Sequence, residues 1–383
     1  MRLRVIARFC LALLFAGAGT IGVQSQPSSP PPAASATPRP PAPLISRGNT
    51  GAVGVITGME GGTYARTGAD LTILDDDTLR VLPTLGKGSL QNLSDILYLR
   101  GVDIGFVQAD ALAYAKQHAM FPGLTQNIRY IAKLYDEEVH VLVRKDITRL
   151  EDLNGQRVNV DVLGSGSAMT AEILLDALGI KPNVERDKQV NAILKLKGGE
   201  IAGIIQVAGA PMPLMADVSA DSGLHLLPVP LNQTLAQTYL PDRFTHNIYP
   251  QLVPVGTEVQ TIAVGDVLAA FAWQPRTERA NNLNHFVDVF FSKFDQFQQP
   301  PRHPKWREVN LAAEVPGWTR LNAAQEWLDR QTSARTANAA TQVRFNTFLS
   351  QTHSGVNGSL SDADREKLFQ QFVAWDKQRP AAR

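Results

Sequence analysis

The chain is almost without cysteine. Its 383 residues include a single one, Cys10, at the start of an apolar N-terminal run. No small-residue triplet of the kind that precedes a lipidated cysteine comes before it, so we do not expect a lipid anchor there. If the N-terminal segment is removed on export, the remaining protein has neither a disulfide nor a thiol nucleophile.

Metal-binding and catalytic patterns are lacking too. The histidines are scattered, and none pairs with another histidine or an acid at the spacing of a zinc site. Two of them, His140 and His225, fall in predicted strands, where we expect core or edge residues. The sequence has no G-x-S-x-G motif and no catalytic triad that sequence alone supports. We therefore expect no metal, no cofactor, no catalytic residue and no enzymatic activity.

Nucleotide-binding loops are incomplete. A P-loop needs Ser or Thr directly after its lysine, but in "GKGS" Lys87 is followed by Gly88. The segment "GSGSAM" begins like G-x-G-x-x-G, but Met169 replaces the third glycine, which normally permits close packing of helix on strand. Neither loop therefore predicts a bound nucleotide.

The first 25 residues have the pattern of a signal peptide. Arg2, Arg4 and Arg8 precede the apolar run, and small residues follow at the usual cleavage distance, in "VQS". Removing these three arginines takes the net charge from +1 to −2. We expect a periplasmic protein, tethered to the membrane if the signal is retained. A mildly acidic exported protein is a poor nucleic-acid binder, so we expect no nucleic-acid partner.

Residues 26–47 are rich in Pro, Ala and Ser and cannot build a core. An extended polyproline-type segment rises ~3.1 Å per residue, so the part "PSSPPPAASATPRPPAP" reaches roughly 50 Å. We predict an extended tether here. A plain disordered N-terminus of the exported chain is the alternative.

From residue 52 onward, short apolar runs alternate with helical segments. This alternation predicts an α/β protein with largely parallel sheets. The predicted strands include 52–57, 79–85, 104–108, 128–135, 139–145, 157–163, 203–207 and 224–229. We divide the chain into a first lobe (48–145), a second lobe (146–255), a return to the first lobe (256–330) and a C-terminal helical extension (331–383).

The two halves contain similar segments. "LRGVDIGFVQA" resembles "LKGGEIAGIIQVA", and both have a Gln near the end of a buried strand: Gln108 and Gln206. A Ser-containing Gly turn also precedes a helix in each half, in "GKGSLQN" and "LGSGSAMT". This similarity suggests two related lobes, although such βα turns are common and a chance match stays open.

Gly-rich turns before helices bind anions, because backbone N–H groups and the helix dipole point at the ligand. The first such turn, "MEGGTY", also contains an acid, Glu60. We expect the side chain of Glu60 to point to solvent. Alternatively, it meets a ligand ammonium group, which would favour an amino acid over a dicarboxylate. Ser89, Ser165 and Ser167 are placed to bind a ligand or only to cap helices.

Read in order, these segments resemble the TAXI family, the TRAP-associated extracytoplasmic immunogenic solute-binding proteins. The resemblance is carried by "GGTY", "GSLQNLSDILYLRGVDIGFVQAD", "LEDLNGQRVNVDVLGSGS", "GGEIAGIIQVAGAPMP" and "YPQLVPVGTEVQTIAVGDVL". It covers roughly residues 52–318. The chain departs from the family pattern at Ala65, where a second aromatic is common, and in "EVPGWTRLNAAQEWL", which stands where a late "HPGA" element is expected.

The resemblance implies a type II periplasmic-binding-protein fold, with two α/β lobes, a hinge and a central ligand cleft. It implies delivery of a small organic acid or amino acid, such as glutamate, a dicarboxylate or an oxo acid, to a TRAP membrane permease. We expect a monomer. The ligand-binding residues carried over by motif are Gly62, Thr63, Tyr64, Ser89, Asn92, Gln108, Asp110, Ser165, Gly166, Ser167, Gly209, Ala210 and Pro211.

The chain continues past the family's usual end into "SDADREKLFQQFVAWDKQ". Leu368, Phe369, Phe372 and Trp375 form an apolar helix face, which we expect to pack on the body of the protein. The alternative is a partner-binding face. The C-terminal extension and the tether together motivate a second functional hypothesis. The protein would then be a tethered periplasmic sensor or interaction protein on the same fold, without a transport role.

Overall fold

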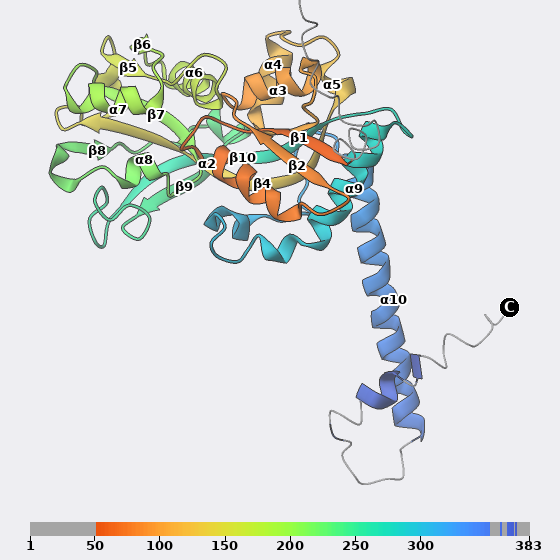
Figure 1. Ribbon diagram of the computed structural model, residues 1–383. Coiled ribbons are helices and arrows are strands. Elements are labelled where there is room, and N and C mark those ends of the chain that lie inside the picture. Colours follow the sequence, from red (N-terminus) through yellow and green to blue (C-terminus); the bar gives the residue numbers. More distant parts are fainter. Residues whose placement is uncertain (1–50, 353–360, 362–365, 371, 374–383) are drawn as a thin grey trace, which may run out of the picture. The chain divides into compact units, whose positions relative to one another are not determined.

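A computed structural model describes residues 51–352, 361, 366–370 and 372–373 (Figure 1). The predicted signal peptide and tether lie outside the described residues, as does most of the chain after residue 352. Within the described ranges, no helix is long and apolar enough to cross a membrane.

The first lobe is built on three parallel strands, in which β1 pairs with both β2 and β3. They are β1 (Ala52–Ile56), β2 (Arg80–Thr84) and β3 (Ile104–Gln108). Four helices accompany them in sequence: α2 (Thr63–Asp70), α3 (Ser89–Tyr98), α4 (Asp110–Gln117) and α5 (Leu124–Asn127). β3 is buried throughout, as its apolar run predicts.

The second lobe repeats this plan, with β5 between β6 and β7 in parallel pairing. Its elements are β5 (Arg157–Asn159), α6 (Gly166–Leu178), β6 (Asn183–Glu185), α7 (Gln189–Lys197), β7 (Gly203–Ala208) and α8 (Pro213–Ala216). Two further strands extend the sheet: β8 (Leu224–Leu226) on β4, and β9 (Leu240–Thr245) on β10.

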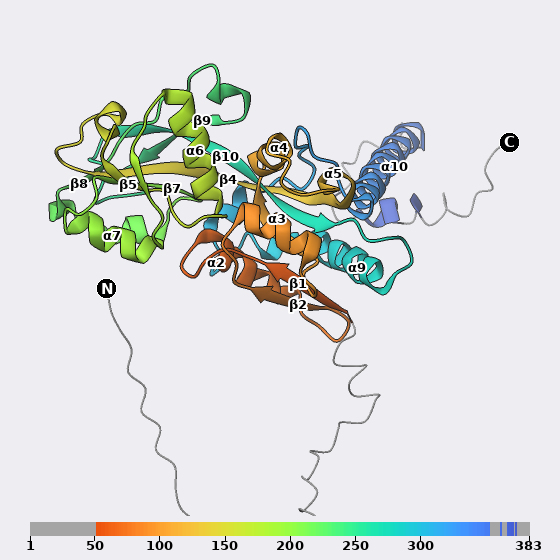
Figure 2. The same cartoon turned by 90° about the horizontal axis from the view of Figure 1, so that it is seen from above.

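Two long strands, β4 (Ile128–Arg144) and β10 (Glu258–Phe271), run from one lobe into the other (Figure 2). They give the continuous strand order β2-β1-β3-β10-β4-β7-β5-β6. The prediction of two separate strands, 128–135 and 139–145, is wrong: the polar residues between them belong to the same strand. The prediction of parallel strands holds inside each lobe, but β10 pairs antiparallel with β3 and with β4. The exact lobe boundaries stay predictions.

The segment after β10 returns to the first lobe. Its helix α9 (Glu278–Ser292) packs aromatic side chains into the first-lobe core, with Phe290 in contact with Trp306. The last long helix, α10 (Asn322–Thr352), is held at its beginning by the edge-on contact of Trp327 with Phe291.

Part of the predicted apolar face near the C-terminus lies within the described residues. Its rings Phe369 and Phe372 contact Phe345 of α10, which is fully buried. Packing of this face on the body of the protein stays a prediction. Trp375 lies outside the described residues.

Candidate functional site

A small cavity of about 50 Å³ lies between the two lobes. Its first-lobe lining includes Gly62, Thr63, Tyr64 and Gln108, and its second-lobe lining includes Asp161, Ser165, Gly166, Ser167 and Gln206. Glu137, from the shared strand β4, completes it. Most of these side chains are buried, so the cavity lies inside the protein.

The beginning of α2 forms one wall. Gly61 has a φ of +80°, which glycine adopts freely and which lets the chain turn into the helix at Thr63. The first N–H groups of a helix have no acceptor inside that helix and carry partial positive charge. This wall can therefore donate hydrogen bonds to an anionic group.

The beginning of α6 forms the opposite wall. Ser165 caps the helix, because its hydroxyl oxygen accepts from the N–H of Ala168 at 3.1 Å. Ser167 ties the helix to β7, since its Oγ accepts from the N–H of Val207 at 3.0 Å. The resulting position of Gly166 brings a second helix N-terminus to the cavity.

A serine and a glutamine form a similar hydrogen bond in each lobe. In the first lobe, the N–H of Gln108 donates to the Oγ of Ser89 at 3.0 Å. In the second, the amide of Gln206 donates to the Oγ of Ser167 at 2.7 Å. Each serine thus joins the start of a helix to the end of a buried strand, β3 or β7, which gives the sequence similarity between the halves a physical meaning.

Two carboxyl groups line the cavity. Burial raises the pKa of Asp161 to about 6 and that of Glu137 to about 8. At neutral pH Asp161 is therefore mostly ionised and Glu137 mostly protonated. Within the described chain, the basic side chain that lines this cavity is Lys87, which is exposed to solvent. The cavity consequently carries about one negative charge at pH 7.

Two of the residues that line the cavity hold unpaired acceptors. Asp161 and Gln206 are buried, and Oδ1 of Asp161 and Oε1 of Gln206 have no hydrogen-bond partner among the described residues. A buried acceptor without a donor costs free energy, so such atoms in a cavity mark where a ligand donor fits. Both unpaired atoms accept hydrogen bonds, which favours a ligand with several N–H groups at this point.

Behind the cavity, Glu137 forms a second pair of acids with Asp266. Tyr64 donates from its hydroxyl to Oδ1 of Asp266 at 2.6 Å. Burial, and next the charge of Glu137, raise the pKa of Asp266 well above its usual range. Two carboxyl groups so close in a buried place do not both ionise at neutral pH.

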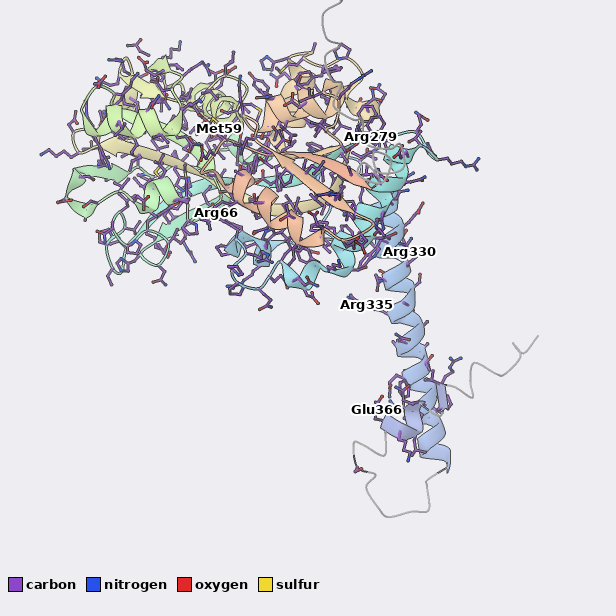
Figure 3. All side chains as sticks on the ribbon, in the orientation of Figure 1. Met59, Arg66, Arg279, Arg330, Arg335 and Glu366 are labelled. Atoms are coloured by element: carbon purple, nitrogen blue, oxygen red, sulfur yellow. The ribbon has the colours of Figure 1, made fainter. Side chains whose placement is uncertain are left out.

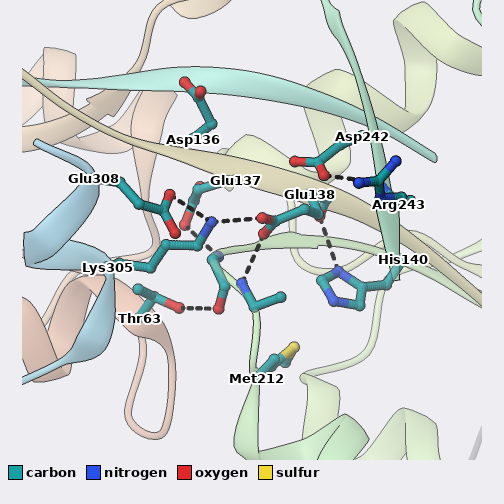
Figure 4. A network of polar contacts seen from close by, with 12 residues as sticks. Thr63, Asp136, Glu137, Glu138, His140, Met212, Asp242, Arg243, Lys305 and Glu308 are labelled. Carbon is teal, nitrogen blue, oxygen red and sulfur yellow. Dashed lines mark hydrogen bonds and ion pairs between the residues drawn. The ribbon is translucent and has the colours of Figure 1, made fainter. Parts of the chain in front are cut away.

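A polar network ties the lobes together beside the cavity (Figure 4). Lys305, from the segment after β10, donates to Oε1 of Glu138 at 2.5 Å and to Oε2 of Glu308 at 2.9 Å. The other oxygen of Glu138 accepts from the N–H of Ala210 at 2.7 Å. Thr63 donates to the carbonyl of Gly209 at 3.2 Å. Strand β4 is thus held to both lobes at the point where it passes between them.

The remaining predicted ligand residues have other neighbours. Asn92 donates to the carbonyls of Thr57 and Phe106, and it does not line the cavity. Asp110 accepts from Thr170 at 3.1 Å and from Tyr239 at 2.8 Å, which links the lobes outside the cavity.

Gly209 and Ala210 border the network around Lys305, and neither they nor Pro211 line the cavity. Glu60 is exposed and lines an adjoining outer groove. Arg66, the basic residue just after the first glycine turn, is exposed and does not line the cavity (Figure 3).

His140 behaves as a core residue, as predicted. It is fully buried, its Nδ1 lies 2.9 Å from the carbonyl oxygen of Glu138, and its Nε2 lies 2.7 Å from the hydroxyl of Tyr249. Burial lowers its pKa to about 3, so the ring is neutral. Among the described residues, no group of three His, Cys, Asp or Glu is placed to hold a metal ion.

Sequence reasoning missed Glu137, Glu138, Asp161 and Lys305. A signal was present for the first three, because "LYDEEVHV" and "VNVDVL" place acids inside apolar strand patterns. A buried acid in such a pattern needs a partner or a function. Lys305 carried no such signal, since its partner lies 167 residues away in the sequence.

Two α/β lobes that share long strands and enclose a polar cavity define a periplasmic-binding-protein fold of type II, as predicted. The model of the NMT1-like family matches residues 55–305. The chain therefore belongs to the NMT1-like family.

Solved structures of similar fold include three binding or transport proteins. A mutant ArgBP from T. maritima is 17% identical, with 67% of this chain and 93% of that chain covered and a TM-score of 0.36. A TctC solute binding protein from Polaromonas is 15% identical, with 64% and 88% covered and a TM-score of 0.36. A periplasmic transporter is 12% identical, with 75% and 96% covered and a TM-score of 0.44. These similarities concern the fold alone.

Proposed function

We propose that this protein is a solute-binding protein that holds a small amino acid between its two lobes and releases it to a membrane permease. The observation that carries the proposal is the composition of the inner cavity. Two helix N-termini, one from each lobe, meet there beside the carboxylate of Asp161.

This arrangement matches a zwitterion. A ligand ammonium group can donate to the unpaired oxygens of Asp161 and Gln206, while a ligand carboxylate can accept from the first N–H groups of α2 and α6. The ionised Asp161 disfavours a second buried anion, because like charges repel more strongly away from water. A dicarboxylate or a 2-oxo acid lacks the ammonium group and is the weaker candidate.

The finer assignments rest on the sequence motifs. The resemblance to TAXI proteins supports a TRAP-type permease as the partner, and the N-terminal pattern supports export to the periplasm. Of the residues carried over by motif, we propose Gly62, Thr63, Tyr64, Gln108, Ser165, Gly166 and Ser167 as ligand contacts. Ser89, Asn92 and Asp110 act by fixing the strands and helices around the cavity.

The test is a calorimetric and thermal-shift screen of amino acids, dicarboxylates and 2-oxo acids on the exported chain. We expect binding and a rise in melting temperature with amino acids, and weaker or no response with the other two classes. Binding of dicarboxylates alone would contradict the assignment to amino acids. No response in any class would favour the alternative, a sensor or interaction protein on the same fold.

A further inference from the structure

The inner cavity is too small for a whole amino acid. Its volume of about 50 Å³ is the space of one to a few water molecules. An ammonium group and the atoms next to it fit there, but an amino acid side chain does not. A solute bound by its charged head must therefore extend out of this cavity.

A groove of about 650 Å³ adjoins the inner cavity. The two spaces share Met59, Lys87 and Gln189 in their linings, so they adjoin each other. The groove too is lined by both lobes: the loops around Gly61 and Gly86 belong to the first, and the start of α7 belongs to the second. Its volume lies within the usual range of small-molecule sites.

The groove exposes apolar side chains. Leu85 is 59% exposed and Val190 is 62% exposed, and both line it together with Met59 and Val162. Its charged residues are of both signs, with Glu60 beside Lys87 and Lys188. The apolar side chains of the groove favour an apolar group on the ligand.

We propose that the natural solute is an elongated amino acid. Its charged head occupies the inner cavity at Asp161, and an apolar side chain of several carbon atoms occupies the groove between Leu85 and Val190. This inference rests on the proposed function, because it takes the inner cavity as the site of the head group. It adds the class of side chain: long and apolar, rather than short or acidic.

Titration calorimetry with straight-chain 2-amino acids tests this inference. The probes are alanine, 2-aminobutyrate, norvaline, norleucine and 2-aminooctanoate, on the full chain. Burying one methylene group strengthens binding about three- to fourfold. We expect the affinity to rise by about this factor per carbon along the series.

Val190→Asp places a charge in the groove without touching the inner cavity. We expect it to abolish the gain in affinity with chain length. Leu194→Asp is the matched control, because Leu194 lies on the same helix, is 64% exposed and does not line the groove. Leu194→Asp should keep the full gain in affinity with chain length. Melting curves of both variants verify that they fold.

The outcomes separate the two proposals. Equal affinity along the series, or a gain that survives Val190→Asp, overturns the groove as the side-chain site while the proposed function stands. No binding of any amino acid overturns the proposed function itself. Asp161→Asn should weaken every member of the series by the same factor, because it acts on the common head group.

Discussion

Gly166 of the second lobe and Gln108 of the first lobe meet where the lobes approach each other. A Cβ atom built on Gly166 would lie 1.6 Å from Oε1 of Gln108 and 2.7 Å from Oγ of Ser89. A side chain fits at this position only if the end of Gln108 shifts or the lobes move apart. Glycine therefore permits the close approach of the lobes seen here.

Gly166→Ala should consequently weaken solute binding at least about 10-fold, because it holds open the cavity that encloses the ligand. The helix itself gains from alanine, so the fold should survive. Calorimetry measures the affinity and circular dichroism the fold. The matched control is Gly198→Ala, whose Cβ would have its nearest neighbour at 3.3 Å. Unchanged affinity in Gly166→Ala would show that the lobes do not need this contact.

Solute affinity should depend on pH through Asp161, whose pKa is raised to about 6 by burial. As the pH falls below 6, protonation removes the charge that attracts the ligand ammonium group. The affinity should therefore fall by up to about tenfold per pH unit, the limit for one proton. Titrations between pH 4.5 and 7.5 measure this slope. Asp161→Asn should show weak binding and a much smaller slope. A wild-type affinity that rises toward low pH would contradict the role of Asp161.

Glu137 should make the solute-free protein less stable as the pH rises. Its pKa is about 8 in the folded state and near the ordinary 4.5 in the unfolded state. Between these values the folded protein holds a proton that the unfolded chain has lost, so the free energy of unfolding falls with rising pH. This decrease in the free energy of unfolding is complete above about pH 8.

Glu137→Gln should remove much of this dependence. The variant should melt near the wild-type temperature at pH 4 and at least about 2 °C higher at pH 8, the shift that ~1 kcal/mol produces in a domain of this size. Melting curves from pH 4 to 9 test this, with the exposed Glu151→Gln as control. Parallel wild-type and variant curves over this range would show that Glu137 is not buried as a neutral acid.

Lys305→Met should strongly destabilise the protein at pH 8. It leaves the side chain of Glu138, only 6% exposed, without its cation, and breaking one side of a buried ion pair costs about 3–5 kcal/mol. The loss should be smaller at pH 5.5, where Glu138 can take up a proton because burial raises its pKa to about 7.

The double variant Lys305→Met, Glu138→Gln should recover part of this loss, which denaturant unfolding measures as a coupling energy. Lys293→Met is the comparison, since Lys293 forms a 3.7 Å ion pair with Asp76 in which both side chains are exposed. A Lys305→Met variant as stable as Lys293→Met would contradict the structural role of the network.

Much of the fold could be predicted from the sequence, because apolar runs and glycine turns report local structure. Strands β1, β2, β3, β5, β7 and β8 begin within one residue of their predicted positions. The break predicted between residues 135 and 139 was wrong, because acids in a strand look like a turn. Buried in β4 and held by partners from other segments, Glu137 and Glu138 continue the strand instead.

The candidate site was only partly predictable. The glycine turns and helix starts are local features, so the sequence indicated Gly62, Thr63 and Gly166. The charge of the cavity depends on contacts between distant segments, and these carry no local signal. The ion pair of Lys305 and the place of Asp161 in the lining of the cavity therefore needed the structure. The position of Asp161 changed the expected ligand from any small carboxylate to one that also carries an amino group.

The most direct test of this account is a pair of calorimetric titrations with norleucine and its 2-oxo analogue, which differ in the amino group alone. The account predicts that norleucine binds at least about 10-fold more tightly to the wild-type protein, the value of one charge-assisted hydrogen bond. It also predicts that Asp161→Asn removes most of this difference, and asparagine suits the left-handed backbone of this position, where φ is +74°. Equal or tighter binding of the 2-oxo acid by the wild-type protein would contradict the assignment of this cavity to an amino-bearing solute.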